Sequence, residues 1–436
     1  MKKNNTKIDV IVVGFALFAM FFGAGNLIFP PALGLMTGKS WTIGFIFYFI
    51  ADIGLAAYAV WIMTYKSGQA EDITYPLGKT PSRILVTAVI LCIGPGFAIP
   101  RTAATTFELA ILPYLGIESN KILLLIFSIV FFAVVLLLSI RSSKVVDIIG
   151  KVLTPVLLVC IAIMIIKGII SPQAQVGAEL TGSIIKEGIY NGYQTMDMMA
   201  ALIFTSIIIG SFKSKGYTNN EDIKKLTIKA TSLSVLLLLV IYGGLTYLGA
   251  SCAPALRDEM MEGNINHASL LIAIIDSLMG KFGLFIIAIV VAFACLTTAI
   301  GLTSSASEYF ASITNLSYEK LVIIICIVST FVCNLGLSQI ISISGPILQL
   351  IYPLITLMIV TALLQNKIAS TAPFRITAIV TLIISLIETL GNIFSIEPFI
   401  KFISKLPLYS FGFSWLIPAI LIFVATSFLA VKNSWS

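Results

Sequence analysis

Long apolar runs recur along the whole chain, and they restrict how it can fold more than any other feature. Examples are the runs Ile122–Ile140 and Leu284–Ile300, each long enough to cross a hydrocarbon core of about 30 Å as a helix. Hydrophobic residues make up 58% of the 436 residues and charged residues only 11%, whereas soluble domains carry roughly 25% charged residues. Because no soluble fold could bury so much apolar surface, we expect an all-α integral membrane protein in a lipid bilayer.

Glycine, proline and charged residues divide these runs into twelve predicted spans. The spans lie near residues 9–35, 41–65, 84–111, 121–140, 146–169, 189–211, 226–250, 281–307, 319–336, 338–365, 374–394 and 407–431. Most of the 27 basic residues then fall on one side of the membrane, and such a bias marks the cytoplasmic side. We therefore expect a multi-pass protein of the cell membrane (the inner or plasma membrane) with both termini in the cytoplasm.

The spacing of the spans predicts an internal repeat. The first five spans occupy residues 9–169 and the next five residues 189–365, which are segments of similar length. Because an odd number of crossings reverses the direction of the chain, the second repeat is expected to be inverted relative to the first. Two extra helices follow near residues 374–431. No loop is long enough for a soluble domain, so residues 1–436 are expected to form one transmembrane domain.

Composition also excludes several classes of function. The net charge of +7 is scattered between the spans and forms no basic stripe, so nucleic acid is not an expected partner. The six cysteines include no C-x-x-C pair, and the chain has a single histidine and no phosphate-binding loop. We expect no enzymatic activity, no enzymatic cofactor and no obligatory protein partner. A channel would show a polar pore or a ring of charge, and no periodic lining of that kind is visible.

The first predicted span contains a stretch that is hard to keep in one continuous helix. Gly23, Gly25, Asn26, Pro30 and Pro31 fall within nine residues, and glycine and proline both disfavour an uninterrupted helix. We predict a break near Gly23 to Gly25. Free backbone groups are tolerated at membrane depth only where they line a cavity or bind something. Carbonyls of the first half-helix could face a cation, and amides of the second could face a carboxylate.

The sixth predicted span has a comparable interruption. Gly192, Tyr193, Gln194, Thr195 and Asp197 stand where an apolar helix should run. Interruptions at equivalent places in two repeats indicate a central binding site. The alternative is an ordinary helix start with Asp197 as its N-cap.

Polar residues in other spans leave their roles open. The run Thr297–Ser305 in the eighth span is rich in hydroxyls, which suit a hard cation but also serve close packing between helices. Asp52, Arg101 and Glu108 are ionisable residues at predicted membrane depth. Each is a candidate for function or for pairing with another helix.

Three motifs together resemble those of a known family. Phe22–Pro31, Gly94–Thr102 and Gly301–Ser305 are similar to motifs of the branched-chain amino acid:cation symporter family of bacterial carriers, and the likeness covers nearly the whole chain. The resemblance implies uptake of leucine, isoleucine and valine with sodium or protons. It also implies a five-plus-five inverted repeat like that of the bacterial leucine transporter, with broken first and sixth helices. Sodium symport is the leading interpretation; proton symport and passive amino-acid exchange are the alternatives.

The same resemblance implies site residues. The implied sodium ligands are the carbonyls of Ala19, Phe22 and Ile300 and the hydroxyls of Thr303 and Ser304. The implied substrate-binding residues lie at the two interruptions: Phe21, Gly23, Ala24, Gly25 and Asn26 in the first, and Gly192, Tyr193, Gln194 and Thr195 in the second. One feature departs from the distant relatives, because Leu27–Phe29 occupy the place of an arginine used there in an outer gate. An arginine gate at this position is therefore not expected.

Overall fold

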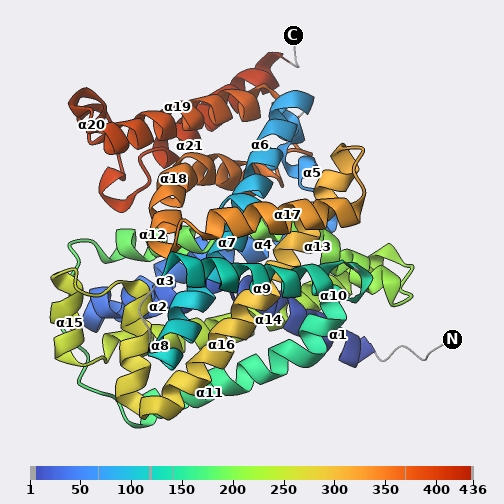
Figure 1. Ribbon diagram of the computed structural model, residues 1–436. Coiled ribbons are helices and arrows are strands. Elements are labelled where there is room, and N and C mark those ends of the chain that lie inside the picture. The colour runs from blue at the N-terminus through green and yellow to red at the C-terminus, as the bar shows by residue number, and fades with distance from the viewer. Residues whose placement is uncertain (1–5, 67, 117–119, 141, 369, 434–436) are drawn as a thin grey trace.

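A computed structural model describes residues 6–66, 68–116, 120–140, 142–368 and 370–433 of the chain (Figure 1). Within these residues every regular element is helical. The physical reason is the apolar environment, where each backbone amide and carbonyl needs a partner inside its own segment. Large apolar side chains lie on the outside, as expected of a surface that faces lipid: Leu137, Phe331 and Phe428 are each about three-quarters exposed.

The part of the chain up to Ile170 forms eleven α-helices joined by short irregular turns. The α-helices are α1 (Thr6–Phe21), α2 (Ala24–Thr37), α3 (Trp41–Phe49), α4 (Leu55–Tyr65), α5 (Glu71–Thr74), α6 (Lys79–Leu91), α7 (Ala98–Thr106), α8 (Leu112–Leu115), α9 (Lys121–Ser139), α10 (Ser142–Ile148) and α11 (Thr154–Ile170). The 3-10 turns are η1 (Gly38–Ser40) and η3 (Tyr75–Leu77), and the π-helical segments are η2 (Ile50–Gly54), η4 (Cys92–Gly96), η5 (Phe107–Ile111) and η6 (Ile149–Leu153). Asp52 lies in η2 and Glu108 in η5, and π-helical segments are frequent at functional sites.

The rest of the chain continues the same pattern. Its elements are α12 (Ile184–Thr195), α13 (Asp197–Ser214), α14 (Asn220–Ala250), α15 (Pro254–Met261), α16 (His267–Ile313), α17 (Tyr318–Cys333), α18 (Leu337–Thr361), α19 (Ala372–Phe394), α20 (Glu397–Ile403), η7 (Tyr409–Phe411) and α21 (Leu416–Asn433). Polar caps begin the long helices: the side chains of Asn219 and Asn266 accept hydrogen bonds from the first amides of α14 and α16. Helix α16 bends at Gly280, which has a positive φ of 56°.

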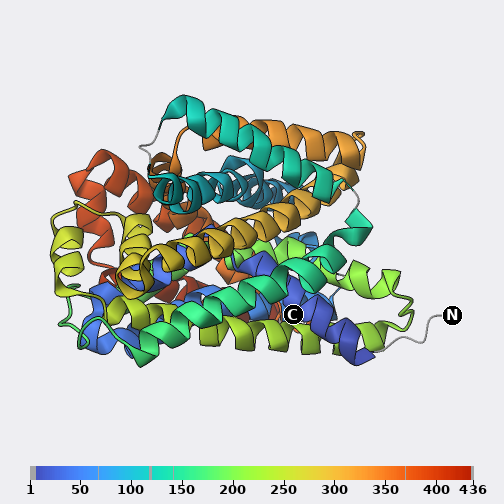
Figure 2. The same ribbon diagram turned by 60° about the horizontal axis from the view of Figure 1, so that its bottom comes forward.

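Helices that are distant in the sequence surround the first two helices, α1 and α2. Helix α14 packs along both α1 and α2, and α16 contacts α1, α2 and α7. On another face, α9 and α17 lie side by side (Figure 2). The C-terminal helices α19, α20 and α21 gather at one edge of the molecule against α18 (Figure 1). The first break in the chain therefore lies inside the bundle, where its backbone is shielded from lipid.

The structure confirms an all-α membrane protein, while the number of crossings stays a prediction. Among the described residues, nine helical segments are long and apolar enough to span a membrane, and α21 contains a shorter apolar stretch. Twelve were expected. Each expected span overlaps a helix, but α2 to α4 run on as one segment (24–65), and α1 and α17 have only 16 residues each. Breaks and turns within the apolar runs cause this difference.

Candidate functional site

The first helix break separates α1 from α2 at Phe22 and Gly23, next to the predicted position. The Gly23 amide donates to the side-chain Oδ1 of Asn26 (3.2 Å) and so leaves the carbonyl of Ala19 free of its usual helical partner. That carbonyl oxygen lies instead 2.8 Å from the hydroxyl of Thr297 and 3.3 Å from that of Thr298, both in α16. The break thus turns a backbone oxygen of α1 toward the hydroxyls of another helix.

The second break lies at Met196, between α12 and α13. Met196 has left-handed backbone angles (φ 70°, ψ 13°), which end α12 and redirect the chain. Gly192 to Thr195 are helical, so the predicted interruption is displaced to the following residue. Gly192 instead allows close packing, because a Cβ there would lie 2.9 Å from the carbonyl oxygen of Tyr48.

Asp197 is the first residue of α13 and not its N-cap, which is Met196. The alternative of an ordinary helix start with Asp197 as its cap is therefore wrong. Oδ2 of Asp197 accepts a hydrogen bond from Nδ2 of Asn26 (2.8 Å). This contact joins the two helix breaks through buried side chains, since Asn26 is 2% exposed and Asp197 is 4% exposed.

The side chain of Arg101, a residue of α7, lies at the C-terminal end of α12. It follows η4, where Gly94 and Pro95 interrupt the helix, and its guanidinium donates to the carbonyls of Gln194 (2.9 Å) and Thr195 (3.4 Å). The cation thereby satisfies two carbonyls at the negative end of a helix dipole. Arg101 and Glu108 do not pair: the Glu108 carboxylate accepts from the Leu337 amide (3.3 Å).

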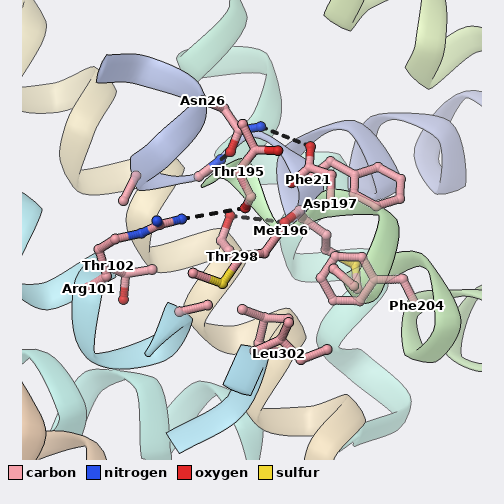
Figure 3. A pocket seen from close by; sticks show the side chains of 16 residues that line it. Phe21, Asn26, Arg101, Thr102, Thr195, Met196, Asp197, Phe204, Thr298 and Leu302 are labelled. Carbon is pink, nitrogen blue, oxygen red and sulfur yellow. Dashed lines mark hydrogen bonds between the residues drawn. The ribbon is translucent and has the colours of Figure 1, made fainter. Parts of the chain in front are cut away.

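A small cavity of about 20 Å³ lies between the two breaks (Figure 3). Its lining has a polar part and an apolar part. The polar part is formed by Asn26, Arg101, Thr102, Thr195, Asp197 and Thr298, and the apolar part includes Met20, Phe21, Ile93, Ala200, Phe204 and Leu302. A cavity of this volume has room for water but not for an amino acid, so an amino acid would need the surrounding helices to move apart.

The predicted substrate residues divide into two groups. Phe21, Gly23, Ala24, Asn26 and Thr195 line this cavity. The others, Gly25, Gly192, Tyr193 and Gln194, do not line it, although a Cβ on Gly25 would lie 2.9 Å from a guanidinium nitrogen of Arg101. Tyr193 instead lines a separate cavity of about 100 Å³, together with Lys186 and Glu388.

The predicted sodium ligands lie on and next to two packed helices: Ala19 is in α1 and Phe22 follows it, whereas Ile300, Thr303 and Ser304 are in α16. The hydroxyls nearest the Ala19 carbonyl belong to Thr297 and Thr298, and the Thr298 hydroxyl lies closer to the carbonyl of Met20 (3.0 Å) than to that of Ala19 (3.3 Å). Thr303 and Ser304 lie six residues further along α16, about 9 Å at 1.5 Å per residue. Their hydroxyls are buried and have no hydrogen-bond partner among the described residues. Phe22 and Ile300 are buried too.

Thr297 and Thr298 are thus the polar residues that the resemblance did not single out. They belong to the same hydroxyl-rich run, so the signal was present in the sequence. The rotation of α16 about its axis decides which hydroxyls face α1, and that rotation depends on packing.

Asp52 lies behind the cavity. It is fully buried (0% exposed) and does not line the cavity. Its Oδ1 accepts a hydrogen bond from the hydroxyl of Thr195 (2.7 Å), a residue that lines the cavity.

The comparisons with known proteins agree with this architecture. The chain resembles the MHP1 transporter of the nucleobase-cation-symport-1 family, solved in a closed conformation with bromovinylhydantoin bound (TM-score 0.56, 12% identity, covering 97% of this chain and 93% of that one). It also resembles MhsT in complex with L-phenylalanine (TM-score 0.56, 15% identity, covering 96% and 98%). These similarities confirm the expected leucine-transporter-like fold.

Sequence relatives cover nearly the whole chain. The branched-chain amino acid permease BrnQ of Bacillus subtilis is 33% identical over 428 residues (96% of each chain). The BrnQ permease of Escherichia coli K12 is 33% identical over 424 residues (95% of this chain and 94% of that one). The model of the branched-chain amino acid transport protein family matches residues 6–433. The chain therefore belongs to the branched-chain amino acid transport protein family.

Proposed function

We propose that this chain takes up leucine, isoleucine and valine by sodium-coupled symport with alternating access. The observation that carries this proposal is the cavity between the two helix breaks. Its polar part presents a guanidinium from Arg101 and a carboxylate from Asp197, and its apolar part presents aliphatic and aromatic side chains. An amino-acid zwitterion with a branched aliphatic side chain has the complementary charges and the complementary apolar surface. The sequence relatives, named as branched-chain amino acid permeases, support the same substrate class.

Each part of the substrate has a proposed partner. The ammonium group binds near Asp197, and the carboxylate binds near Arg101 and the amides at the start of α2, where the helix dipole favours an anion. The side chain packs among Phe21, Phe204 and Leu302. Because one methylene in an apolar pocket changes binding by only ~1–3 kcal/mol, the three substrates are expected to compete for one site.

Sodium is proposed to bind between α1 and α16. The carbonyl of Ala19 and the hydroxyls of Thr297 and Thr298 are neutral oxygen ligands, which suit a hard cation. Thr303 and Ser304 form the alternative ligand pair implied by the family resemblance. In the part of the chain that the structure describes, their buried hydroxyls have no hydrogen-bond partner, which is compatible with that role.

A pair of matched substitutions distinguishes the two ligand sets. Purified protein in liposomes is given radiolabelled leucine under an inward sodium gradient, a proton gradient or neither. We expect accumulation with sodium, and we expect Thr298→Ala to raise the half-saturating sodium concentration at least tenfold, whereas Thr303→Ala changes it less than twofold. The reverse result would assign sodium to Thr303 and Ser304.

Other outcomes of the same assay would replace the proposal. Accumulation driven by protons alone would establish proton symport, for which Asp52 and Asp197 are the candidate groups. Uptake that only equilibrates under every gradient would identify a passive exchanger. The proposed location is the cell membrane with both termini in the cytoplasm, which protease access to tags at each end would check.

A further inference from the structure

Helices α4 and α14 form a groove on the outside of the bundle. One face of α4, between Ala57 and Thr64, and one face of α14, between Ile228 and Leu239, line it, with residues at intervals of three and four. The volume of the groove is about 400 Å³, whereas an engineered cavity of roughly 150 Å³ already binds benzene. The groove therefore has room for a hydrocarbon chain of several more carbon atoms.

The walls of this groove are largely apolar. Three hydroxyl side chains line it, and each donates to a carbonyl of its own helix one turn earlier (2.7, 2.9 and 2.9 Å): they are Thr64, Thr231 and Ser232. Leu236 also lines the groove and is 57% exposed, so the groove opens on the lipid-facing surface. Since its hydroxyls are already hydrogen-bonded, the groove suits a hydrocarbon chain better than a polar ligand.

The end of α4 meets the start of α14 at one end of the groove. Nζ of Lys224 lies 5.7 Å from the centre of the Tyr65 ring, and that ring lies 5.4 Å from the ring of Trp61. Tyrosine and tryptophan are typical of the level where the lipid headgroups begin. The face of α14 that lines the groove runs about 16 Å from this end, which is close to half of a 30 Å hydrocarbon core. The groove thus has the depth of one leaflet.

Positive charge gathers at the same end of the groove. Lys225 stands three residues before Ile228 and seven before Ser232, so it lies on the groove side of α14, and Lys229 borders that side. Both lysines are exposed, and within the described part of the chain neither forms an ion pair. From Ala230 to Ala250 the helix carries no charged residue. The groove therefore joins a cationic end to an apolar length.

The acidic residues at the start of α14 do not cancel this charge. Glu221 is paired with Lys224 (2.8 Å). Asp222 stands seven residues before Lys229, which places it about 10 Å away along the helix. Lys225 and Lys229 therefore remain available to an anion at the mouth of the groove.

We infer that this groove binds a phospholipid with a negatively charged headgroup. One acyl chain lies between α4 and α14, and Lys225 and Lys229 contact the phosphate. The bilayer supplies such a molecule, and its shape, an anionic head on an apolar chain, is complementary to the groove. Because α14 also packs along α1 and α2, the bound lipid supports the bundle around the first helix break.

Native mass spectrometry of the purified protein in detergent measures the recognition of the headgroup. The protein is titrated with phosphatidylglycerol or with phosphatidylcholine that carries the same acyl chains, so that the two lipids differ only in the headgroup. We expect phosphatidylglycerol to bind at least tenfold more tightly, and Lys225→Gln/Lys229→Gln to lose most of this preference, as two lysines near a charged surface should. Lys401→Gln/Lys405→Gln is the matched control, because it also removes two exposed lysines four residues apart.

A second pair of variants tests the groove itself. Ala57→Phe fills it from α4 and should weaken phosphatidylglycerol binding at least tenfold. Ala133→Phe places the same ring on the exposed face of α9 and should leave the binding unchanged. If Ala57→Phe does not fold, Ser232→Phe takes its place, because it fills the groove from α14. Phosphatidylglycerol with a photoreactive acyl chain should label residues 57–64 and 228–239.

Several results would overturn the inference. Equal binding of the two lipids, or a preference that survives Lys225→Gln/Lys229→Gln, would contradict recognition of the headgroup. Unchanged binding with the groove filled, or labelling only of other segments, would place the lipid elsewhere. These assays contain neither leucine nor a sodium gradient, so their failure leaves the proposed transport function standing, and failure of transport leaves the lipid site standing.

Discussion

Arg101 holds together parts of the site that are far apart in the sequence. Its guanidinium donates to the carbonyls of Gln194 and Thr195 at the end of α12. The same group lies 5.9 Å from the centre of the Phe29 ring in α2. A guanidinium presents several donors in a fixed plane, whereas a lysine ammonium is a single point of charge. Charge alone therefore does not explain the choice of arginine at this position.

We expect Arg101→Lys to weaken leucine binding at least tenfold, because the ammonium cannot satisfy both carbonyls at the end of α12. Hydrogen bonds from charged groups contribute about 1.5–3 kcal/mol each, and 1.4 kcal/mol corresponds to tenfold in affinity. Arg375→Lys is the matched control, since Nε of Arg375 donates to the Pro76 carbonyl (2.8 Å) away from the cavity. Equilibrium binding of labelled leucine to both variants measures the difference, and equal losses would show that Arg101 acts only on stability.

Among the elements, the first helix break was predictable and the second only in part. Glycines mark the first break, and the chain leaves the helix at Phe22 and Gly23. The second break falls on Met196 with positive φ, a conformation that methionine rarely adopts. No local residue signals it, because tertiary contacts of Thr195 and Asp197 impose it. The sequence likewise could not show which hydroxyls of the run Thr297–Ser305 face α1, because that depends on how α16 packs.

Helices α2 and α14 touch through their backbones, and this contact predicts a stability effect. A Cβ on Gly249 would lie 1.8 Å from the carbonyl oxygen of Pro31, so Gly249→Ala must push the helices apart. Overpacking of this kind costs about 1–3 kcal/mol. The control is Gly210→Ala in α13, where a Cβ meets nothing within 4 Å and alanine should stabilise the helix by about 0.5–1 kcal/mol. Thermal unfolding in detergent compares them, and similar melting temperatures would contradict the close contact.

At the scale of the whole molecule, an ion-pair cluster joins helices far from the cavity. Nζ of Lys215, just after α13, lies 2.7 Å from Oδ1 of Asp147 in α10 and 3.7 Å from Oδ1 of Asp9 in α1. The hydroxyl of Tyr217 also donates to Asp9 (3.0 Å). Helix α13 has 18 residues, so this cluster lies about 27 Å along the helix from Asp197. It connects the first half-helix to the bundle at one end of the molecule.

Lys215→Met should therefore loosen this end while leaving the fold intact. The substitution keeps an apolar stem of similar length but leaves Asp9 and Asp147 without this cation, so the start of α1 should separate more often from α10 and α13. We expect faster amide hydrogen exchange in residues 6–14, and faster leucine release if alternating access opens the protein here. Lys224→Met is the control, because it removes an exposed pair with Glu221 within α14 (2.8 Å), worth about 0.2–0.5 kcal/mol. Equal exchange in the two variants would mean that the cluster is a surface feature without a role in closing the molecule.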